Sequence, residues 1–397
     1  MITGLGAVTS IGGTLEHFWT NLLEGVCGIR PFSLFDSASY RTQTAAEVAE
    51  IPDGFLTPAE RRRMSRADRM GVAAAREALR AAGIDTRRED PSRLGVILGG
   101  GTSGLIDSEA FFELYLRGRK ARPSKVLNHL PDSITDRVAE RFGLEGIKST
   151  ITTACSSSAN AMGYAFDAIA AGLADVIVTG GSDVLARLTY GGFNSLRSVD
   201  PDPCRPFDRE RKGLSIGEAA GILVFEEEGR ARRRGAPVVA EFRGYGVTSD
   251  AYHMTAPDPS GSAGGRTIRA ALENAGVNPA DVDYVNAHGT ATPQNDSAET
   301  AALKAALGER AREIPVSSIK SMIGHCLCAS GAIEAVATAL TVRDGKIPPT
   351  IHYSHPDPAC DLDYVPNVAR DVDVDVALSN SFAFGGNSSV VVLTRYA

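Results

Sequence analysis

Small and apolar residues along this chain gather into runs that alternate with stretches of mixed polarity. Residues 161–181 (AMGYAFDAIAAGLADVIVTGG) form one such run, which predicts a buried helix followed by a buried strand. Strands that are apolar throughout and separated by helices are typical of parallel or mixed sheets covered on both faces. The pattern therefore predicts an α/β fold.

The succession of helix and strand occurs twice. In the first half, residues 78–84 (ALRAAGI) end a helix before the strand at 93–104, and in the second, residues 271–277 (ALENAGV) end a helix before the strand at 282–293. Both helices stop at a glycine, as is common at helix C-termini. Both strands run into a loop rich in glycine and threonine. These matches indicate an internal duplication.

The correspondence extends further along the chain. Residues 149–169 and residues 316–340 each read as a short strand, a turn of small residues and an apolar helix. The strands expected at 176–184 and 376–393 then occupy matching late positions. Two such halves stacked through their small-residue helices would give five layers, αβαβα, built from two pseudo-symmetric halves. The N-terminal turns of those two helices should then converge near the centre.

Charge and composition limit the class of protein. The charged stretch 226–235 (EEEGRARRRG) is the closest approach to a boundary, and we divide the chain into halves at 1–232 and 233–397. The net charge of −7 argues against nucleic acid as a partner. No apolar run is long enough to span a membrane. Six scattered cysteines suit a reducing compartment, so we expect a cytoplasmic protein.

The turn before the first small-residue helix holds a cysteine between hydroxyl residues, in the stretch 152–160 (TTACSSSAN). Cysteine is among the most often buried residue types, so Cys155 can be a packing residue. The alternative is a nucleophile in the first helical turn, where the positive end of the helix dipole would lower the thiol pKa. His325 occupies the equivalent turn of the second half, and His288 ends a buried strand. Three such residues at matching loop positions favour catalysis.

Other chemistries fit the sequence less well. His325, Cys326 and Cys328 offer three potential zinc ligands, but their spacing is unlike that of a structural site and no second paired cluster completes it, so we expect no metal. The chain has no G-x-S-x-G elbow at a strand-to-helix turn. The glycine-rich segment 99–104 (GGGTSG) lacks the Lys-Ser/Thr ending of a phosphate loop.

Four stretches together resemble the signature regions of the β-ketoacyl-[acyl-carrier-protein] synthases, the elongating condensing enzymes of the thiolase superfamily. They are TACSSSAN (153–160), NAHGTATPQND (286–296), KSMIGHCLCASGAIE (320–334) and NSFAFGGNSS (380–389). The resemblance follows the chain in order over nearly its whole length. It implies the thiolase-like five-layered fold and, because two histidines accompany the cysteine, the elongating class rather than the starter-condensing class.

The resemblance also implies a reaction, a decarboxylative Claisen condensation. An acyl group would be carried on Cys155 and joined to malonyl-[acyl-carrier-protein], giving β-ketoacyl-carrier protein. His288 and His325 would stabilise the enolate, and one of them would assist decarboxylation. The amides of Cys155 and Phe384 would form the oxyanion hole. Phe384 would act as a gate whose loop bends at Gly385 and Gly386.

Four further residues match positions of the family's site. Lys320 would stabilise charge around the histidine and Glu334 would orient Lys320, although a buried Lys–Glu pair can equally be structural. Thr290 and Thr292 would bind the malonyl-pantetheine portion. A threonine at a strand end can equally cap the next helix.

The resemblance implies partners as well. Two basic stretches would dock the acidic acyl carrier protein, although charge runs are by default solvated faces. The docking residues would be Arg62, Arg63, Arg119, Lys120 and Arg122. No cofactor is expected, because phosphopantetheine arrives on the carrier. Family members are usually homodimers, and a heterodimer stays open.

Two questions stay open at this level. The pathway is either fatty-acid elongation or a polyketide or aryl-polyene cluster. A different role is that of the non-catalytic, chain-length-determining partner of a ketosynthase heterodimer, against which the presence of Cys155, His288 and His325 argues. The chain also departs from the family at Cys326–Ser330, where Leu-Leu-Gly-Ala-Ala is usual. A larger side chain at Cys328 would narrow the space beside the active site or shift the helix.

Overall fold

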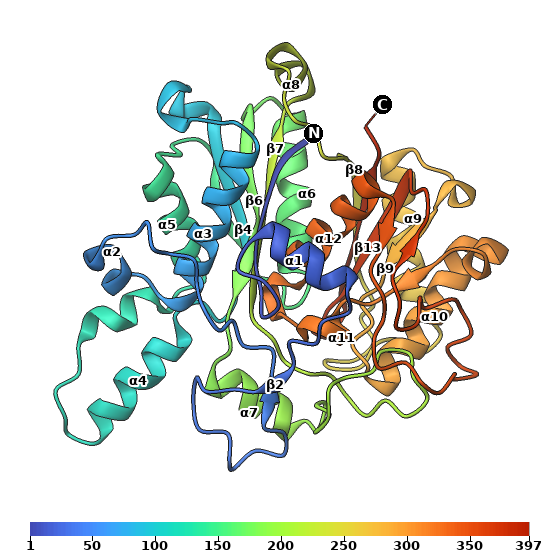
Figure 1. Ribbon diagram of the computed structural model, residues 1–397, viewed down its shortest axis with the longest axis horizontal. Helices are drawn as coiled ribbons and strands as arrows, with labels where there is room; N and C mark the ends of the chain where they lie inside the picture. The colour runs from blue at the N-terminus through green and yellow to red at the C-terminus, as the bar shows by residue number, and fades with distance from the viewer. Residues whose placement is uncertain (397) are drawn as a thin grey trace.

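The computed structural model describes residues 1–396 and contains two five-stranded mixed sheets (Figure 1). In the first sheet, β4 pairs in parallel with β5 and β6, and β7 runs antiparallel to β6 and β1. In spatial order its strands are β1 (Ile2–Val8), β7 (Ala219–Glu226), β6 (Val176–Asp183), β4 (Leu94–Gly99) and β5 (Lys148–Ile151).

The second sheet repeats the first. Its strands in the matching spatial order are β8 (Glu241–Ser249), β14 (Asn387–Thr394), β13 (Val376–Phe382), β9 (Tyr284–Asn286) and β10 (Val316–Ser317). Strand β9, which matches β4, again pairs in parallel with both its neighbours, β10 and β13, while β14 runs antiparallel to β13 and β8. The predicted duplication is therefore confirmed. The single strand expected at 376–393 is in fact two, because the chain turns back after Phe382.

Helices complete the predicted layers (Figure 1). Two helices cover the outer face of each sheet and two lie between the sheets. The outer helices of the first sheet are α3 (Arg66–Ala81) and α5 (Ser133–Phe142), the central pair is α6 (Ser157–Ala170) and α12 (Ser330–Asp344), and the outer helices of the second sheet are α9 (Ser262–Ala275) and α10 (Pro293–Leu307). The α/β fold with five layers, αβαβα, is confirmed.

The small residues of the central helices let their N-terminal turns meet. A Cβ placed on Gly331 of α12 would lie 3.0 Å from the Cβ of Ala159 of α6. The hydroxyl of Ser158 accepts a hydrogen bond from the amide of Ala332 at 2.8 Å. The predicted convergence of the two turns near the centre of the molecule is therefore confirmed.

The remaining elements connect the layers. Gly83 and Gly276 follow α3 and α9 with φ of +67° and +64°, so both helices end at the predicted glycines. No helix among residues 1–396 is long and apolar enough to cross a membrane. The other helices and strands are α1 (Leu15–Leu23), β2 (Arg30–Pro31), β3 (Thr44–Ala45), α2 (Pro58–Arg63), α4 (Leu105–Leu116), α7 (Arg187–Ser195), α8 (Glu228–Arg234), α11 (Lys320–Ile323), β11 (Lys346–Ile347) and β12 (Arg370–Asp371). Short 3₁₀ helices are η1 (Thr86–Arg88), η2 (Pro91–Arg93), η3 (Pro123–His129), η4 (Pro279–Asp281), η5 (Gly308–Arg312), η6 (Leu327–Ala329) and η7 (Phe384–Gly386).

The exposed helix α8 joins the two halves. The boundary expected between residues 232 and 233 falls inside this helix, which lies between the last strand of the first sheet and the first strand of the second. The last residue of the predicted half 233–397 lies outside the described residues.

Candidate active site

Cys155 lies in the tight turn between β5 and α6. Ala154 adopts a left-handed conformation with φ of +53°, which is unusual for a residue with a side chain. The neighbouring hydroxyls hold this turn: Ser156 donates to the carbonyl of Thr153 at 2.9 Å, and Ser157 donates to the carbonyl of Ala154 at 2.6 Å. The sequence analysis placed Cys155 in the first helical turn, whereas it precedes the first helical residue by two positions.

The thiol is buried and faces two amides. The backbone N–H groups of Phe384 and Cys155 both lower the pKa of the Cys155 thiol, so the two predicted oxyanion donors lie near the same sulfur. Burial raises the pKa of the Cys155 thiol to about 11, although the charge of Lys320 and both amides act in the opposite direction. The expected lowering of this pKa is therefore wrong, because desolvation outweighs the stabilisation at the helix start.

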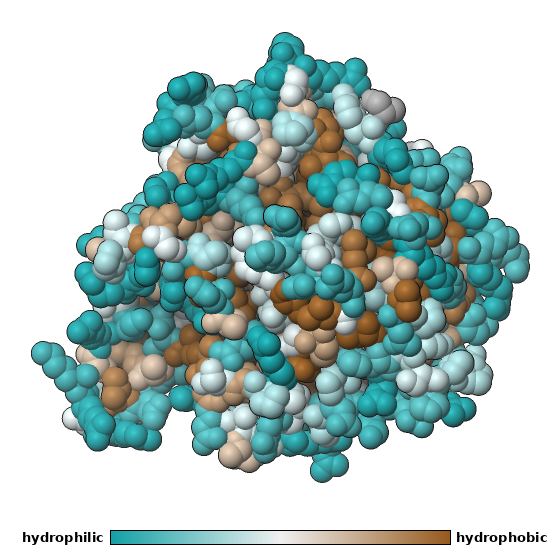
Figure 2. Space-filling view, in the orientation of Figure 1, coloured by the Kyte–Doolittle hydropathy of each residue, from teal (hydrophilic) through white to brown (hydrophobic). Residues whose placement is uncertain are grey.

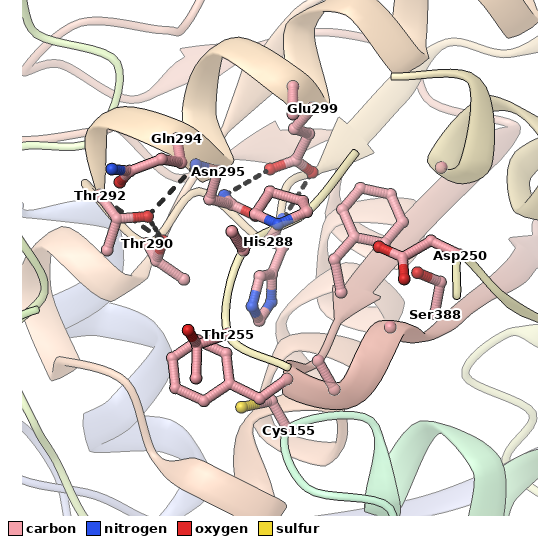
Figure 3. A pocket seen from close by; sticks show the side chains of 18 of the residues that line it. Cys155, Asp250, Thr255, His288, Thr290, Thr292, Gln294, Asn295, Glu299 and Ser388 are labelled. Atoms are coloured by element: carbon pink, nitrogen blue, oxygen red, sulfur yellow. Dashed lines mark hydrogen bonds between the residues drawn. The ribbon is translucent and has the colours of Figure 1, made fainter. Parts of the chain in front are cut away.

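The two histidines meet beside Cys155. His288 follows β9 and His325 follows α11, and their ring centroids lie 5.3 Å apart with the planes nearly perpendicular. Both rings line the same pocket as Cys155 and Phe384. Figure 3 shows the side chains of Cys155 and His288 extending into one space. Residues far apart in the sequence are thus brought together.

Hydrogen bonds to the Nδ1 atoms determine which nitrogen of each imidazole carries the proton. Nδ1 of His325 accepts from the amide of Leu327 at 3.1 Å and lies 2.9 Å from the hydroxyl of Ser330. Nδ1 of His288 lies 3.3 Å from the ammonium of Lys320, which can only donate. Each neutral ring must therefore carry its proton on Nε2. Burial, followed by the charge of Lys320, lowers the pKa of both histidines well below the usual value, so both rings are neutral at pH 7.

Lys320 and Glu334 form a buried pair behind the histidines. The ammonium of Lys320 contacts the carboxylate of Glu334, which projects from the second turn of α12. Lys320 is closer in sequence to His325, but its side chain contacts His288. Burial raises the pKa of Glu334 to about 7, against the effect of Lys320. The charge of Lys320 adds to burial in lowering the pKa of both imidazoles.

The two threonines lie at the pocket wall above α10. Thr292 caps α10, because its hydroxyl accepts from the amide of Asn295 at 3.3 Å. The hydroxyl of Thr290 lies 3.0 Å from that of Thr292, and both residues line the pocket (Figure 3). The capping alternative therefore holds for Thr292, while Thr290 has no capping role.

The loop that carries Phe384 lies between β13 and β14 and is hydrogen-bonded to a neighbouring segment. The amide of Gly385 donates to the carbonyl of Met254 at 2.8 Å, and the amide of Asp250 donates to the carbonyl of Gly386 at 3.1 Å. Gly385 and Gly386 adopt φ of +77° and +76°, which side chains rarely allow. The ring of Phe384 lies 5.7 Å from that of Phe193. This conformation therefore requires the two glycines.

Sequence reasoning missed several residues of the site. Glu299 accepts hydrogen bonds from the amides of His288 and Gly289, both at 2.8 Å, and from the side-chain amide of Asn380 at 3.0 Å. The sequence did hold one indication of this role: Glu299 follows Asp296 by three residues, so both carboxylates lie on the same face of α10. The segment 250–258 gave none, because it has neither a strand nor a helical period, yet Asp250, His253, Thr255, Ala256, Pro257 and Asp258 line the pocket.

The residues that suggested zinc bind other groups. Nδ1 of His325 is used by Leu327 and Ser330, and Sγ of Cys326 lies 3.5 Å from the carbonyl of Ile323. Among residues 1–396, no three His, Cys, Asp or Glu side chains gather as a metal ligand set.

The candidate docking residues lie on two neighbouring projections. Arg62 and Arg63 end α2, and Arg119, Lys120 and Arg122 follow α4. All five are exposed, and none forms an ion pair within residues 1–396. Helices α2 and α4 lie on the same side of the molecule (Figure 1).

Comparisons with known proteins agree along the whole chain. The family description "Beta-ketoacyl synthase, N-terminal domain" matches residues 1–231, and "Beta-ketoacyl synthase, C-terminal domain" matches residues 239–354. The chain is 41% identical to 3-oxoacyl-[acyl-carrier-protein] synthase 2 of Staphylococcus aureus (strain COL), over 100% of this chain and 98% of that protein. Among solved structures, the ishigamide ketosynthase/chain length factor is 35% identical with a TM-score of 0.94, covering 100% of this chain and 98% of that one. A type II polyketide ketosynthase in complex with its acyl-carrier protein is 32% identical with a TM-score of 0.92, over the same shares.

Proposed function

The chain belongs to the β-ketoacyl synthase family, and from this premise we propose that it condenses an acyl group on Cys155 with malonyl-[acyl-carrier-protein]. The observation that carries the proposal is the convergence at Cys155. Two amides lie near its sulfur, and two neutral imidazoles, held perpendicular to each other, line the same pocket. Together they supply one nucleophile and two separate pairs of donors.

The first half-reaction transfers the acyl group. Sγ of Cys155 attacks the carrier thioester, the new Sγ–C bond forms, and the carrier's C–S bond breaks. The thiol proton leaves with the pantetheine sulfur, so the exchange needs no outside reactant. The amides of Cys155 and Phe384 stabilise the oxyanion of the tetrahedral intermediate.

The second half-reaction forms the carbon–carbon bond. Malonyl-carrier loses CO₂, and the electrons of the broken bond form an enolate whose oxygen accepts from the Nε2–H groups of His288 and His325. The enolate carbon attacks the acyl carbonyl, and the C–Sγ bond breaks to release β-ketoacyl-carrier. The freed thiolate takes up one proton from solvent water, which its raised pKa favours. Lys320 and Glu334 hold the positive charge behind the rings and do not touch the substrate.

The partners follow from the same proposal. The acyl carrier protein would bind at Arg62, Arg63, Arg119, Lys120 and Arg122, and it would bring the phosphopantetheine, so that this chain needs no cofactor of its own. Thr290 and Thr292 would contact the pantetheine arm at the pocket wall.

A second subunit would cover the apolar side of the projection formed by α4 and η3. Phe112, Tyr115, Leu116, Leu127 and Leu130 are exposed there, and apolar patches lie among hydrophilic ones over this projection in Figure 2. Strand β5 beside it ends the first sheet and leaves one edge unpaired. A second copy of this chain is the expected occupant. A heterologous subunit is the alternative, because one similar structure is described as a ketosynthase/chain length factor.

The experiment offers the purified protein malonyl-carrier with a panel of acyl-carrier thioesters and analyses the products by mass spectrometry. We expect β-ketoacyl-carrier from at least one acyl chain, and the productive chains separate fatty-acid from polyketide elongation. Absence of product from every chain, with folded protein, would favour the non-catalytic partner subunit instead.

A further inference from the structure

Cys328 occupies a narrow position behind the catalytic turn. A Cβ built on Gly101 would lie 2.3 Å from Sγ of Cys328, so the sulfur fills the space in front of that glycine. Gly101 follows β4, whereas Cys328 belongs to η6, just after His325. The thiol of Cys328, in the second half of the chain, therefore packs directly against Gly101 in the first half.

A buried carboxylate fixes this position. Asp183, at the end of β6, accepts from the amide of Cys328 at 3.1 Å, from the amide of Thr102 at 2.9 Å and from the amide of Val184 at 3.0 Å. Its side chain is fully buried. Three segments are thereby joined at one group, so the distance between Gly101 and Cys328 is set by the backbone. A change in side-chain size at Cys328 will change the gap rather than move its walls.

The side chain of Cys328 is not completely enclosed by its neighbours. Cys328 and Cys155 are each 7% exposed, although both lie deep between the sheets, whereas Cys326 is 1% exposed. Gly101 and Thr102 are half-buried. Burial, then the charge of Asp183 and that of Cys155 raise the pKa of the Cys328 thiol, so the two sulfurs lie near each other.

This space lies where an acyl chain must go. In the proposed reaction the amides of Cys155 and Phe384 would hold the acyl oxygen, and the histidines and threonines, which line the pocket, would face the carrier arm. The tail must leave in another direction. An apolar cluster that includes Leu185, Leu214 and Leu327, with Ile106 and Phe193 packed against it, reaches this region. Phe193 and Leu214 line the pocket with Cys155, and Leu327 directly precedes Cys328.

We propose that Cys328 limits the width of the acyl passage and is a specificity-determining residue for the acyl chain, an inference that rests on the proposed function. The chain would run between the apolar cluster and the wall formed by Gly101 and Cys328. Removing the thiol would admit longer or bulkier chains. The size of the side chain sets the limit, not its redox chemistry.

The test measures acyl loading of Cys155 by intact mass, separately from condensation. Short, medium and long acyl-carrier thioesters are offered to the wild-type protein and to Cys328→Gly, Cys328→Ala and Cys328→Ser. We expect the ratio of long-chain to short-chain loading rates to rise about tenfold in Cys328→Gly, the effect of about one extra methylene. It should rise less in Cys328→Ala and stay near wild type in Cys328→Ser, which keeps the size.

Cys326→Ala is the matched control, because Cys326 is two residues away but its sulfur faces the carbonyls of Ile323 and Gly324. Its loading ratio should be unchanged. An unchanged ratio in folded Cys328→Gly and Cys328→Ala would overturn the inference and leave the proposed function intact. No loading of any chain on wild-type Cys155 would instead contradict the proposed function.

A stability measurement gives a second test that does not depend on activity. Gly101→Ala alone should lower the melting temperature, because its Cβ would meet Sγ of Cys328. Combined with Cys328→Gly, the same substitution should cost less, because of the close contacts only that with Oδ2 of Asp183, at 3.0 Å, would remain. Additive effects of the two substitutions would contradict the proposed contact.

Discussion

The ammonium nitrogen of Lys320 lies 3.3 Å from Nδ1 of His288, and its counter-ion is the buried carboxylate of Glu334. Lys320 begins α11 and His288 lies in the loop after β9, so this contact forms only when the second half of the chain has folded. It places one positive charge behind a pair of imidazoles that must stay neutral. After burial, the charge of Lys320 is the next cause that lowers the pKa of both imidazoles, and in the proposed reaction it acts without touching the substrate.

Replacing Lys320 by methionine should shift the pH dependence of condensation. The Lys320 charge lowers the pKa of His288, so its loss raises that pKa, and His288 becomes protonated at a higher pH than in the wild type. The acidic limb of the pH–rate profile should move to higher pH, with the largest loss of rate on the acidic side, because burial still lowers the pKa of His288 in the variant. Lys304→Met is the control, because Lys304 lies at the surface and pairs with Asp361. Equal profiles for both variants would rule out an electrostatic role for Lys320.

Replacing either histidine should separate the two half-reactions. His288→Ala and His325→Ala each remove one Nε2–H donor for the enolate, so condensation should fall about 100- to 1,000-fold. Acyl loading of Cys155 should fall far less, because its oxyanion is held by backbone amides. Single-turnover assays of loading and condensation distinguish the two effects. Loss of loading to the same extent as condensation would assign the histidines to the first step.

The thiol of Cys155 should be slow to react with alkylating agents near neutral pH. Because burial raises its pKa to about 11, the rate of alkylation by iodoacetamide should rise about tenfold per pH unit between about pH 7 and about pH 10, without a plateau. Peptide mapping separates this rate from that of the half-buried Cys27. A plateau near pH 7 would show that the helix start lowers the pKa after all.

Two features of the fold show what the sequence pattern could predict. The paired segments around Cys155 and His325 each gave a strand, a turn and a helix, and the sheets have the same strand order. Such periodicities follow from local packing, so they can be read from the chain. Residues 376–393 were expected to form one strand, but they form the antiparallel pair β13 and β14. One long strand and two strands joined by a short turn have the same apolar pattern in the sequence.

The electrostatics of the site could not be read in the same way. The pKa of Cys155 was expected to fall because the helix dipole is visible in the sequence, whereas desolvation depends on which segments cover the sulfur. The contact of Lys320 with His288, and the role of Glu299, likewise arise between segments that only the folded chain brings together. The sequence of residues 250–258 did not indicate that this loop lines the pocket, because a loop has no helical or strand periodicity.

Reversing charge on α2 should weaken carrier binding alone. Arg62→Glu with Arg63→Glu should raise KM for malonyl-carrier about five- to tenfold and leave kcat unchanged, because exposed charges act mainly on association. Raising the salt concentration should reduce the difference from wild type. Arg232→Glu with Arg233→Glu on the exposed helix α8 is the matched control. Equal effects of the two double variants would remove α2 from the docking surface.

Peptide mapping after a single turnover tests the central claim most directly. The protein is incubated with acyl-carrier, sampled, and then mixed with malonyl-carrier. The account predicts one acyl group on Cys155 in the first sample, followed by its loss as β-ketoacyl-carrier and CO₂ form, and no loading in Cys155→Ala. Acyl attached to any other residue, or product formed by Cys155→Ala at the wild-type rate, would contradict it.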